Sequence, residues 1–537
     1  MGDNINSASK FPIGISDFSI LRQENRIYVD KTDALYKIVR DQGFYFLSRP
    51  RRFGKSLLIS SIESLFRDGV NYFKDLDIEE KWHDHCYPVI HLDFSMCSEF
   101  LSIEEFKCDF LRMVKDAVAA TGIDFPPKDQ EDPDSTPARF KRIFYRKDLP
   151  HIVLLIDEYD APLNHCLHDR HLFELIKNEL NKFYAVIKQC SSKFRLVFIT
   201  GICRYKNLGI FSGVNFMTDI SLSPEFGTLL GYTREELQKY FASYIEHAAC
   251  VLGLSRAQCL DEMAHHYDGY CFDRQASTHV FSPWSVLNFL KDPKTGFRNY
   301  WYDSAGRPSM LRNYIKSHRL KDPVFYGSDQ RISEYKLDSS QGLEDIDDVS
   351  LLVSAGYLTI KSSDQGSKVF TVNYPNAEVA YSMSSLYLEE LFGKDADLLI
   401  ETSALTLFSV YSPDEIIKRL NIIFASIDYA RYPVKDEAVL RSFVQIYLIG
   451  GGIRGIDIEK HNAFGRSDIE FKARDRYFVM ELKFARAGDD EGQLLEKAKE
   501  QILKRHYGEN AHPELKHIRM ALVFSAEKRQ FVESACF

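Results

Sequence analysis

The sequence contains no run of about eighteen apolar residues, the length that a membrane-spanning helix needs, so it predicts no transmembrane segment and no membrane partner. Residues 1–6 lack the basic and then apolar pattern of a secretory signal, and we therefore expect a cytoplasmic protein. The ten cysteines include no C-x-x-C pair. Such scattered cysteines indicate reduced thiols rather than a disulfide framework or a zinc site.

The chain also lacks an excess of basic residues. Its 537 residues include 68 Lys and Arg against 77 Asp and Glu, which gives a net charge of -9. This balance argues against a protein coated in nucleic acid, although a local basic groove remains compatible with it. A composition of 45% hydrophobic and 27% charged residues is that of a globular protein, and the length suffices for several domains.

Residues 43–57 carry the first motif of the chain. An apolar run typical of a buried strand breaks at residues 48–50, and Gly54-Lys55-Ser56 then opens an amphipathic helix. A strand, a turn, Gly-Lys-Ser and a helix form the context of a phosphate-binding loop, because a helix N-terminus favours anions. We expect Lys55 to bind the β- and γ-phosphates of a nucleotide and Ser56 to bind Mg²⁺.

This loop departs from the usual G-x-x-x-x-G-K-[ST] pattern at its first glycine, which is replaced by Arg49. Pro50 follows and has no N–H group to offer a phosphate. The guanidinium groups of Arg51 and Arg52 are candidates to compensate for this loss. Because Gly-Lys-Ser triplets occur often by chance, an ordinary loop that enters a helix is the alternative for this stretch taken alone.

A second motif lies where the apolar run 152–156 ends in Asp157 and Glu158. Such a run predicts a strand buried on both faces of a parallel sheet, and open α/β sheets bind ligands at the carboxyl ends of their strands. Asp157 is expected to hold Mg²⁺ through a water molecule, and Glu158 to act as general base on the attacking water. The alternative is that these acids only end the strand at solvent; both motifs in this order favour a nucleotide site.

A further apolar strand, residues 195–199, ends in Thr200, which we interpret as a polar sensor beside the γ-phosphate. Its alternative is a threonine that only ends a strand. Arg204 is a candidate phosphate or sensor arginine, and Trp284, farther along, is interpreted as a core residue. The full set of predicted nucleotide contacts is Arg52, Phe53, Gly54, Lys55, Ser56, Leu57, Asp157, Thr200 and Arg204.

Strands that alternate with helices predict a parallel, doubly wound α/β sheet in the N-terminal part. The chain becomes helical after Thr233, as in the small lid that follows many ATPase cores. A helix and a hairpin within residues 346–375 resemble the wing of a winged-helix unit; a nucleic-acid contact and a purely structural hairpin are both open readings. We expect a nucleotide-binding core at 8–225, a helical lid at 226–330, a winged-helix-like connector at 331–395 and a separate α/β domain at 396–537.

The C-terminal part contains the pattern D-x12-E-x-K, formed by Asp468, Glu481 and Lys483. Adjacent strands would bring the two carboxylates together, and Glu481 and Lys483 point to the same side of their strand. Two carboxylates and a backbone carbonyl can hold Mg²⁺, and the lysine can orient or deprotonate a water molecule. Glu437 is a candidate for a further carboxylate. The alternative is a surface strand with a salt-bridged Glu and Lys.

Both halves resemble known families. Residues 8–300, approximately, are similar to the AAA-ATPase-like family found mostly in prokaryotic proteins, in which the Arg-Pro-Arg-Arg-Phe-Gly-Lys-Ser form of residues 49–56 replaces the usual first glycine. The C-terminal region resembles the PD-(D/E)XK nuclease superfamily, and Gln501 and Tyr507 are similar to a glutamine–tyrosine helix of related exonucleases, at a longer spacing. The matching stretches are residues 11–14, 28–32, 49–56, 155–160 and 200–201 in the first family and 465–468 and 481–483 in the second.

The resemblance implies an ATP-binding and hydrolysing protein coupled to a magnesium-dependent nuclease-like domain that acts on nucleic acid, with DNA as the expected substrate. The implied cofactors are ATP and Mg²⁺, and a homo-oligomer is an open possibility. The alternative is a nucleotide-gated binding switch whose nuclease fold no longer cuts. The intact Asp468, Glu481 and Lys483 favour the first hypothesis, and the acidic net charge favours the second.

Overall fold

The structure is a computed structural model that describes residues 10–128, 135–204, 217–301, 327–338, 348–392, 403–430, 432–453, 455–462, 465–509 and 511–537. The chain divides into two compact units, Met1–Leu320 with Asp329–Glu378 and Lys321–Ser328 with Val379–Phe537. Residues 302–326 and 339–347, which belong in part to the predicted lid and connector, lie outside the described residues. Within the described ranges, no helix is long and apolar enough to cross a membrane.

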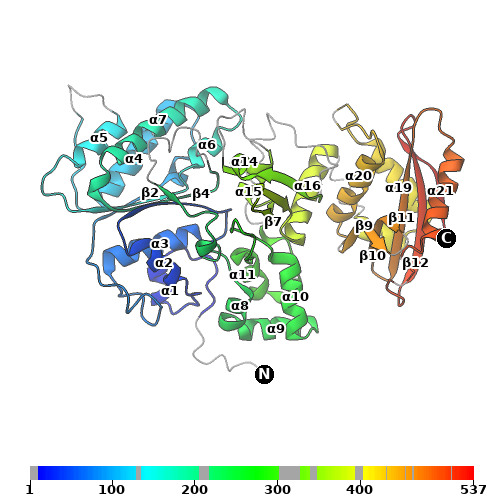
Figure 1. Ribbon diagram of the computed structural model, residues 1–537, viewed down its shortest axis with the longest axis horizontal. Coiled ribbons are helices and arrows are strands. Elements are labelled where there is room, and N and C mark those ends of the chain that lie inside the picture. The colour runs from blue at the N-terminus through cyan, green and yellow to red at the C-terminus, as the bar shows by residue number, and fades with distance from the viewer. Residues whose placement is uncertain are drawn as a thin grey trace. The chain divides into compact units, whose positions relative to one another are not determined.

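Unit 1 is built on a five-stranded sheet in the order β2-β3-β4-β1-β5, with every neighbouring pair parallel. All residues of β3 and β4 are buried, because helices cover both faces of the sheet. Figure 1 shows α1–α3 on one side of this sheet and α4–α7 on the other. The predicted doubly wound sheet is thereby confirmed. Its strands are β1 (Gly43–Ser48), β2 (Val89–Asp93), β3 (Ile152–Asp157), β4 (Phe194–Gly201) and β5 (Thr218–Asp219).

The helices of this layered part have amphipathic sequences that match their burial. In α3, for example, five of the six expected apolar positions, Leu58, Ile59, Ile62, Leu65 and Phe66, are buried, and the sixth, Leu57, is half-buried. The helices are α1 (Phe18–Gln23), α2 (Thr32–Val39), α3 (Lys55–Asp68), α4 (Ile103–Ala119), α5 (Thr136–Ile143), α6 (Ala161–His165) and α7 (Arg170–Gln189).

A helical subdomain follows the sheet. A capping box at Thr233 and Glu236 starts α8, as predicted, and the four helices bury a common core that includes Phe241, Met263 and Phe289. Val29, from the segment between α1 and α2, packs into the same core. The helices are α8 (Arg234–Tyr240), α9 (Ala242–Leu252), α10 (Arg256–Tyr267) and α11 (Pro283–Lys291).

The last part of unit 1 has the order strand, helix, helix, hairpin that a winged-helix unit has. Its three strands form an antiparallel sheet in the order β6-β8-β7. The predicted helix and hairpin are present, and β6 is an additional strand. The elements are β6 (Gln330–Ser333), α14 (Glu334–Asp338), α15 (Asp348–Ala355), β7 (Thr359–Asp364) and β8 (Val369–Asn373). The chain then passes from unit 1 into unit 2 within α16 (Ala377–Phe392).

Unit 2 is a five-stranded mixed sheet in the order β13-β12-β11-β10-β9, in which only the β11–β12 pair is parallel. In Figure 1, α19 and α20 cover one face and α21 the other. From α20 to β12 the order is helix, three strands, helix and strand, which confirms the predicted α/β fold of this part, and β13 follows as an edge strand. The elements are α18 (Ala404–Val410), α19 (Pro413–Ala425), α20 (Glu437–Gly450), β9 (Ile456–Asn462), β10 (Gly465–Ala473), β11 (Arg476–Ala485), α21 (Glu491–Lys504), β12 (Lys516–Ser525) and β13 (Gln530–Cys536).

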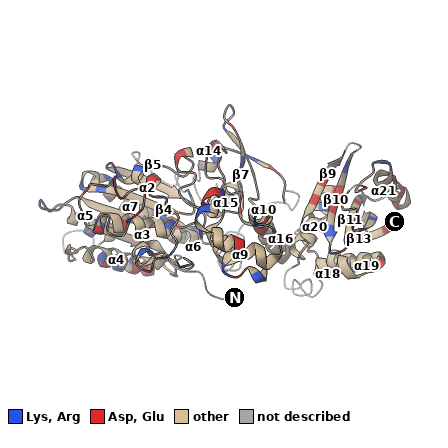
Figure 2. Ribbon diagram, turned by 90° about the horizontal axis from the view of Figure 1, so that it is seen from below, with Lys and Arg blue, Asp and Glu red and all other residues tan. Residues whose placement is uncertain are grey.

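Charged positions of both signs are interspersed along the ribbons in Figure 2, as the near balance of acidic and basic residues requires.

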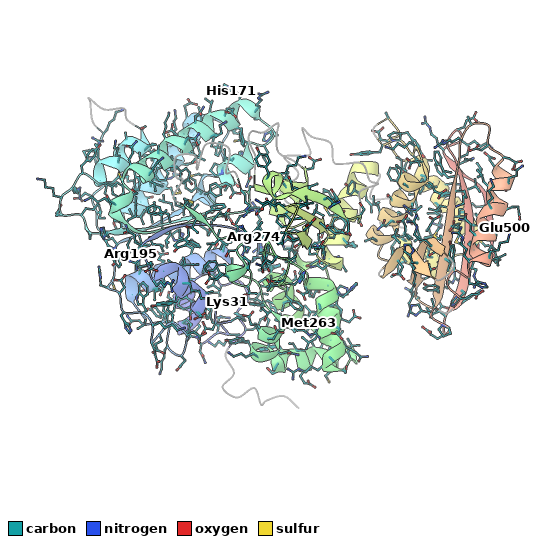
Figure 3. The ribbon with its side chains drawn as sticks, viewed as in Figure 1. Lys31, His171, Arg195, Met263, Arg274 and Glu500 are labelled. Atoms are coloured by element: carbon teal, nitrogen blue, oxygen red, sulfur yellow. The ribbon has the colours of Figure 1, made fainter. Side chains whose placement is uncertain are left out.

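One charged side chain, that of Arg195, joins two elements of unit 1. Arg195 of β4, labelled in Figure 3, is largely buried, pairs with Asp84 at 3.0 Å and donates to the carbonyls of Val39 and Asp41. It therefore ties the amino end of β4 to the end of α2.

Candidate functional site

The loop between β1 and α3 wraps around its own lysine. Lys55 is buried, and its Nζ donates to the carbonyl oxygens of Arg49 and Pro50, at 3.0 Å each. Gly54 has φ +98, in the left-handed region that favours glycine, and it is the N-cap from which α3 begins at Lys55. Because the helix N-terminus and the ammonium lie in one loop, this loop has the means to bind an anion.

Burial lowers the pKa of Lys55, while the carboxylates Glu158, Asp157 and Asp160 counteract this effect and Arg51 adds to it. The three carboxylates therefore only partly offset the effect of burial on the pKa of Lys55.

Asp157 stands at the centre of the polar groups at this sheet edge. The Ser56 hydroxyl donates to its Oδ2 at 2.7 Å, and the Thr200 hydroxyl donates to its Oδ1. The three residues meet because β3 and β4 are parallel neighbours that end at the same edge, where α3 begins. A hydroxyl and a carboxylate in contact are the oxygen donors that Mg²⁺ prefers.

Glu158 differs from Asp157 in backbone and surroundings. It has φ +50, a left-handed conformation that is uncommon for a residue other than glycine, and its carboxyl group lies at the wall of a cavity. Burial raises the pKa of Glu158, Asp157 adds to this rise, and Lys55 and Arg51 oppose it. A carboxyl group with a raised pKa beside an anion-binding loop is suited to accept a proton.

The next two residues have structural roles. The Tyr159 hydroxyl donates to the carbonyl of Cys203 at 2.8 Å. Asp160 is buried and accepts from the backbone N–H groups of Ile202 and Cys203 and from the Asn164 amide. Asp160 therefore fixes the turn after β4.

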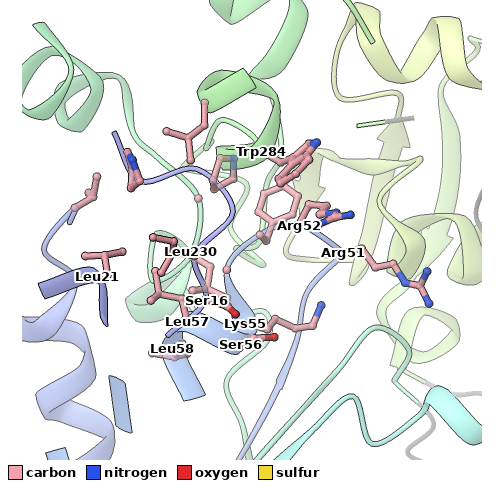
Figure 4. A pocket seen from close by; sticks show the side chains of 18 of the residues that line it. Ser16, Leu21, Arg51, Arg52, Lys55, Ser56, Leu57, Leu58, Leu230 and Trp284 are labelled. Carbon is pink, nitrogen blue, oxygen red and sulfur yellow. The ribbon is translucent and has the colours of Figure 1, made fainter. Parts of the chain in front are cut away.

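The cavity at the loop has a volume of about 590 Å³ and is lined by six of the predicted contacts, Arg52, Phe53, Gly54, Lys55, Ser56 and Leu57, together with Glu158. Figure 4 shows Lys55 and Ser56 at one side of it and Leu21, Leu230 and Trp284 at others. Its polar end thus holds the loop, and its remaining wall is largely apolar. Other wall residues are Pro12, Gly14, Ile15, Ser16, Ile27, Val29, Lys31, Leu229, Gly231, Tyr232 and Leu287.

Sequence reasoning missed the apolar wall. Trp284, interpreted as a core residue, is only half-buried, lines this cavity and carries the Arg52 guanidinium 4.2 Å from its ring centre. The wall is assembled from residues 12–31 and 229–232, which lie far apart in the chain. The one local signal for it was the match of residues 11–14 and 28–32 to the AAA-ATPase-like family.

Arg204 lies away from this cavity. It pairs with Asp219 at 3.1 Å and lines a small second cavity with Arg49, Pro50 and Phe272. The structure thus brings the other predicted contacts together and separates Arg204 from them; its role in phosphate binding stays a prediction.

Arg49, which stands at the position of the usual first glycine, holds the loop to another segment of the chain. The Arg49 guanidinium is buried, donates to the carbonyls of Ser221 and Phe226 at 2.7 and 3.0 Å, and stacks 4.3 Å from the centre of the Phe272 ring. Burial, together with the nearby Arg204, lowers the pKa of Arg49 to about 9. The side chain ties the loop to the segment that enters the helical subdomain, which a glycine cannot do.

In unit 2, the predicted residues Asp468, Glu481 and Lys483 lie where the backbone pairing of β10 with β11 ends. Their paired register runs from Ala473↔Arg476 to Ile469↔Met480. At the next residue along this pairing, Asp468, the side-chain Oδ2 accepts a hydrogen bond of 2.8 Å from the backbone N–H of Leu482. This side-chain bond replaces the backbone hydrogen bond that would continue the pairing of β10 with β11. This opening places the Asp468 carboxylate beside Glu481, as the D-x12-E-x-K spacing predicts.

Buried Glu481 and half-buried Lys483 form an ion pair. The Lys483 ammonium lies 2.9 Å from Glu481 Oε1 and 3.8 Å from the Glu437 carboxylate. Glu481 Oε2 is buried and has no hydrogen-bond partner. An unpartnered buried carboxylate oxygen costs free energy, and a cation at that position would remove the cost.

The pKa values of Glu481 and Lys483 are both shifted by burial and by the charges around them. Burial raises the pKa of Glu481 to about 7, Asp468 adds to the rise and Lys483 opposes it. Burial acts to lower the pKa of Lys483, but Glu481, Glu437 and Asp468 together raise it above its ordinary value. The lysine is therefore a cation in the metal-free protein.

Within the part of the chain that the structure describes, no group of three or more His, Cys, Asp or Glu side chains is arranged to hold a metal ion. Asp468 and Glu481 therefore supply two carboxylates, whereas the Glu437 carboxylate lies near Lys483 and does not form a third ligand with them.

Tyr507 does not join the Asp468–Glu481 pair. Its hydroxyl accepts the Arg466 N–H at 3.1 Å, and its ring packs under α21. Gln501 lies on α21, six residues earlier.

Comparisons with known proteins find a family match for a part of each unit. Residues 12–211 match the family model described as Predicted AAA-ATPase, and residues 435–534 match the PD-(D/E)XK nuclease superfamily. The chain is also 26% identical over 541 residues, covering 98% of both proteins, to the "Uncharacterized protein in vnfD 5'region" of Azotobacter chroococcum mcd 1. The protein therefore joins a domain of the predicted AAA-ATPase family to a C-terminal domain of the PD-(D/E)XK nuclease superfamily.

Proposed function

We propose that this protein binds and hydrolyses ATP in unit 1 and that its C-terminal domain is a magnesium-dependent nuclease that acts on DNA. The observation that carries the proposal is the Asp468–Glu481–Lys483 group at the opening between β10 and β11. We propose the domain limits 8–225, 226–330, 331–395 and 396–537 for the ATPase core, lid, connector and nuclease domain.

In the ATPase part, the loop supplies the groups that a triphosphate needs. Lys55, which now bonds two carbonyls of its own loop, would turn to the β- and γ-phosphates. Ser56 and Asp157 would hold Mg²⁺, and the apolar wall with Leu230 and Trp284 would enclose the base. Glu158 would accept the proton of the attacking water, and Thr200 would hold Asp157 in place.

In the nuclease part, the residues present fit a divalent cation, because Glu481 Oε2 is buried without a partner and Asp468 lies beside it. Asp468 and Glu481 would hold Mg²⁺, which supplies stabilisation of the charge that develops on the phosphate. The Leu482 N–H keeps Asp468 oriented. Lys483, a cation held between Glu481 and Glu437, would orient the attacking water and stabilise its loss of a proton.

The decisive experiment measures both activities on purified full-length protein. Labelled single- and double-stranded DNA is incubated with Mg²⁺ or with EDTA, with and without ATP, and ATP hydrolysis is followed in parallel. We expect cleavage that needs Mg²⁺, its loss in Asp468→Ala and Lys483→Ala, and ATP turnover within about twofold of wild type in both variants. The Asp468→Ala variant should also lose Mg²⁺ affinity, whereas Lys483→Ala should keep it.

Lys55→Ala is the matched variant for the other site. It should lose most ATP affinity in calorimetry, because the ammonium neutralises phosphate charge in a buried loop, and it should keep ATP-independent cleavage. Wild-type protein that cleaves neither DNA nor RNA under any nucleotide condition would favour the binding switch with a silent nuclease fold. Cleavage that survives both nuclease substitutions would show that Asp468 and Lys483 are not the site.

A further inference from the structure

A third carboxylate lies in line with the two of the nuclease site. The β9–β10 register pairs Ile458 with Ile469 and Lys460 with Ser467, so Glu459 stands opposite Asp468 on the side away from Glu481. Glu459 has φ +50, which is a strained conformation for a glutamate. The strand therefore bends at this residue, next to the site.

Arg441 of α20 bridges this third carboxylate and the nuclease site. Its NH2 lies 2.9 Å from Glu459 Oε1, and its NH1 lies 3.4 Å from Asp468 Oδ1. The Arg441 side chain is 18% exposed, so it is ordered by its neighbours yet open to solvent on one side. Asp468 thus has one oxygen held by the Leu482 N–H and the other by a guanidinium.

Arg441 shares its partner Glu459 with a second arginine. Arg466 pairs with the same Glu459 oxygen at 2.9 Å, so two guanidinium groups share one carboxylate there. The Asp468 contact of 3.4 Å is long for a charged hydrogen bond and is correspondingly weak. Arg441 can therefore leave Asp468 at small cost, and Asp468 keeps its orientation through Leu482.

We propose that Arg441 binds the substrate phosphate in the nuclease site and that, in the metal-free protein, it holds the Asp468 oxygen that a metal ion would take. The proposal rests on the nuclease function proposed above. A guanidinium offers two parallel N–H donors that match two phosphate oxygens, which an ammonium cannot do. When a cation takes Asp468, Arg441 is released toward a phosphodiester bound at the same place.

A purely structural role predicts the opposite behaviour toward metal. If Arg441 only pins α20 to the sheet, its loss loosens Asp468 and weakens metal binding. If Arg441 competes with metal for Asp468, its loss removes a positive charge next to a metal ligand and strengthens metal binding. Metal affinity therefore separates the two roles without any measurement of cleavage.

The test compares Arg441→Gln, Arg441→Lys and the matched control Arg466→Gln in the full chain, with Mn²⁺ titrated by calorimetry. A labelled DNA duplex is titrated separately in Ca²⁺, and melting curves report folding. Arg441→Gln should bind Mn²⁺ about five- to tenfold more tightly and the duplex about tenfold more weakly. Arg466→Gln, which lacks the Asp468 contact, should change Mn²⁺ affinity less than twofold.

Arg441→Lys keeps the charge and loses the two-pronged geometry, so it should keep wild-type Mn²⁺ affinity and lose about threefold or more in duplex affinity. If Arg441→Gln does not fold, this variant alone decides, and unchanged duplex binding overturns the proposal. Unchanged or weaker Mn²⁺ binding by a folded Arg441→Gln also overturns it. Wild-type protein that binds no Mn²⁺ contradicts instead the nuclease function on which the proposal rests.

Discussion

Glu158 is the residue on which the proposed ATP hydrolysis depends most directly. It lines the cavity of the phosphate-binding loop, and burial raises its pKa, whereas the next carboxyl group, Asp160, is absent from the cavity wall and accepts from the backbone N–H groups of Ile202 and Cys203. We predict that Glu158→Gln binds ATP within about threefold of wild type and turns it over at least about a hundredfold more slowly, because an amide keeps the shape and cannot accept a proton.

Calorimetry and steady-state hydrolysis measure the two effects separately. Asp169→Asn, at the N-cap of α7, is a suitable control carboxamide, since that residue caps its own helix and is absent from the cavity wall. Wild-type turnover by Glu158→Gln would rule out Glu158 as the base.

Glu481 gives the nuclease site a pH dependence whose sign can be worked out. Burial and then Asp468 raise its pKa from 4.5 to about 7, so the folded, metal-free protein holds a proton there that the unfolded chain releases. Its contribution to the free energy of unfolding is therefore present at low pH and is lost as the pH rises through about 7. A metal ion must displace this proton, so metal affinity rises with pH up to that value.

We predict that Mn²⁺ affinity of wild-type protein rises about tenfold per pH unit between pH 5.5 and 6.5 and levels off above about 7.5. Isothermal titration in two buffers of different ionisation enthalpy should show about one proton released per ion in the lower range. Glu481→Gln should bind Mn²⁺ weakly with little dependence on pH in this range. An affinity that is flat across it in the wild type would contradict the predicted protonation.

At the scale of elements, one ion pair holds the N-terminal segment of the cavity wall against the helical subdomain. Lys31, labelled in Figure 3, donates to both oxygens of Glu236 at 2.6 and 2.7 Å and to the carbonyl of Thr228. Glu236 also closes the capping box that starts α8. Burial lowers the pKa of Lys31, and Glu236 counteracts this effect. The Glu236 carboxylate thus caps the N-terminus of α8 and also holds Lys31 of the cavity wall.

We predict that Glu236→Gln lowers the free energy of unfolding by about 2 kcal/mol, because it leaves the half-buried Lys31 ammonium with only the weaker charge interaction with Asp30. ATP affinity should fall several-fold as the wall loosens. The double variant Lys31→Met with Glu236→Leu should recover part of the stability, since it removes both charges. Chemical denaturation measures the first effect and calorimetry the second.

The exposed pair Lys81–Asp33 provides the control, and Lys81→Met should leave the free energy of unfolding nearly unchanged, because solvent screens an exposed ion pair. Equal losses in Lys81→Met and Glu236→Gln would show that burial of the Lys31–Glu236 pair does not matter.

At the scale of the whole molecule, the phosphate-binding loop is linked by a short series of contacts to the helix that leaves unit 1. The Trp301 indole donates to the Arg51 carbonyl at 3.3 Å, and the Trp301 N–H donates to Glu378 at 2.8 Å. Glu378 is fully buried, also accepts from the Ser285 hydroxyl, and is the last residue of unit 1. From there α16 continues into unit 2.

The winged-helix-like part touches the same loop. Gly356, just after α15, has φ +88, and a Cβ there would lie 2.7 Å from the Pro50 side chain. A loop that rearranges around ATP would therefore act on both Gly356 and Trp301. Such contacts can shift which arrangement of the two units is populated, provided that ATP binds the two arrangements with different affinity.

We predict that Glu378→Gln hydrolyses ATP within about twofold of wild type and loses most of the difference in DNA cleavage between ATP and no nucleotide. The amide keeps the size of the side chain and weakens its hydrogen bonds to Trp301 and Ser285. The measured quantity is the ratio of cleavage rates with and without ATP, compared with Glu262→Gln, an exposed change on α10. An unchanged ratio in Glu378→Gln would contradict this coupling.

The sequence by itself determined the local chemistry and the periodic elements. Gly54-Lys55-Ser56 after an apolar run, the acids that end β3 and the D-x12-E-x-K spacing depend on residue order alone, because a loop, a strand end and a strand pair are set by neighbours in the chain. The parallel sheet and the order of elements in unit 2 follow from the same alternation. The short β5, the edge strand β13 and β6 were missed, since their patterns are short and they form by pairing with strands already present.

Only the tertiary structure decided which distant residues complete the sites. Trp284 and residues 12–31 line the main cavity, Arg204 pairs with Asp219 outside that cavity, and Arg49 donates to the carbonyls of Ser221 and Phe226. Arg441 and Glu459 joined Asp468 through the packing of α20 on a strained strand. Such contacts join residues far apart in the chain, and the burial that sets the pKa values of Glu158 and Glu481 exists only once the layers have packed.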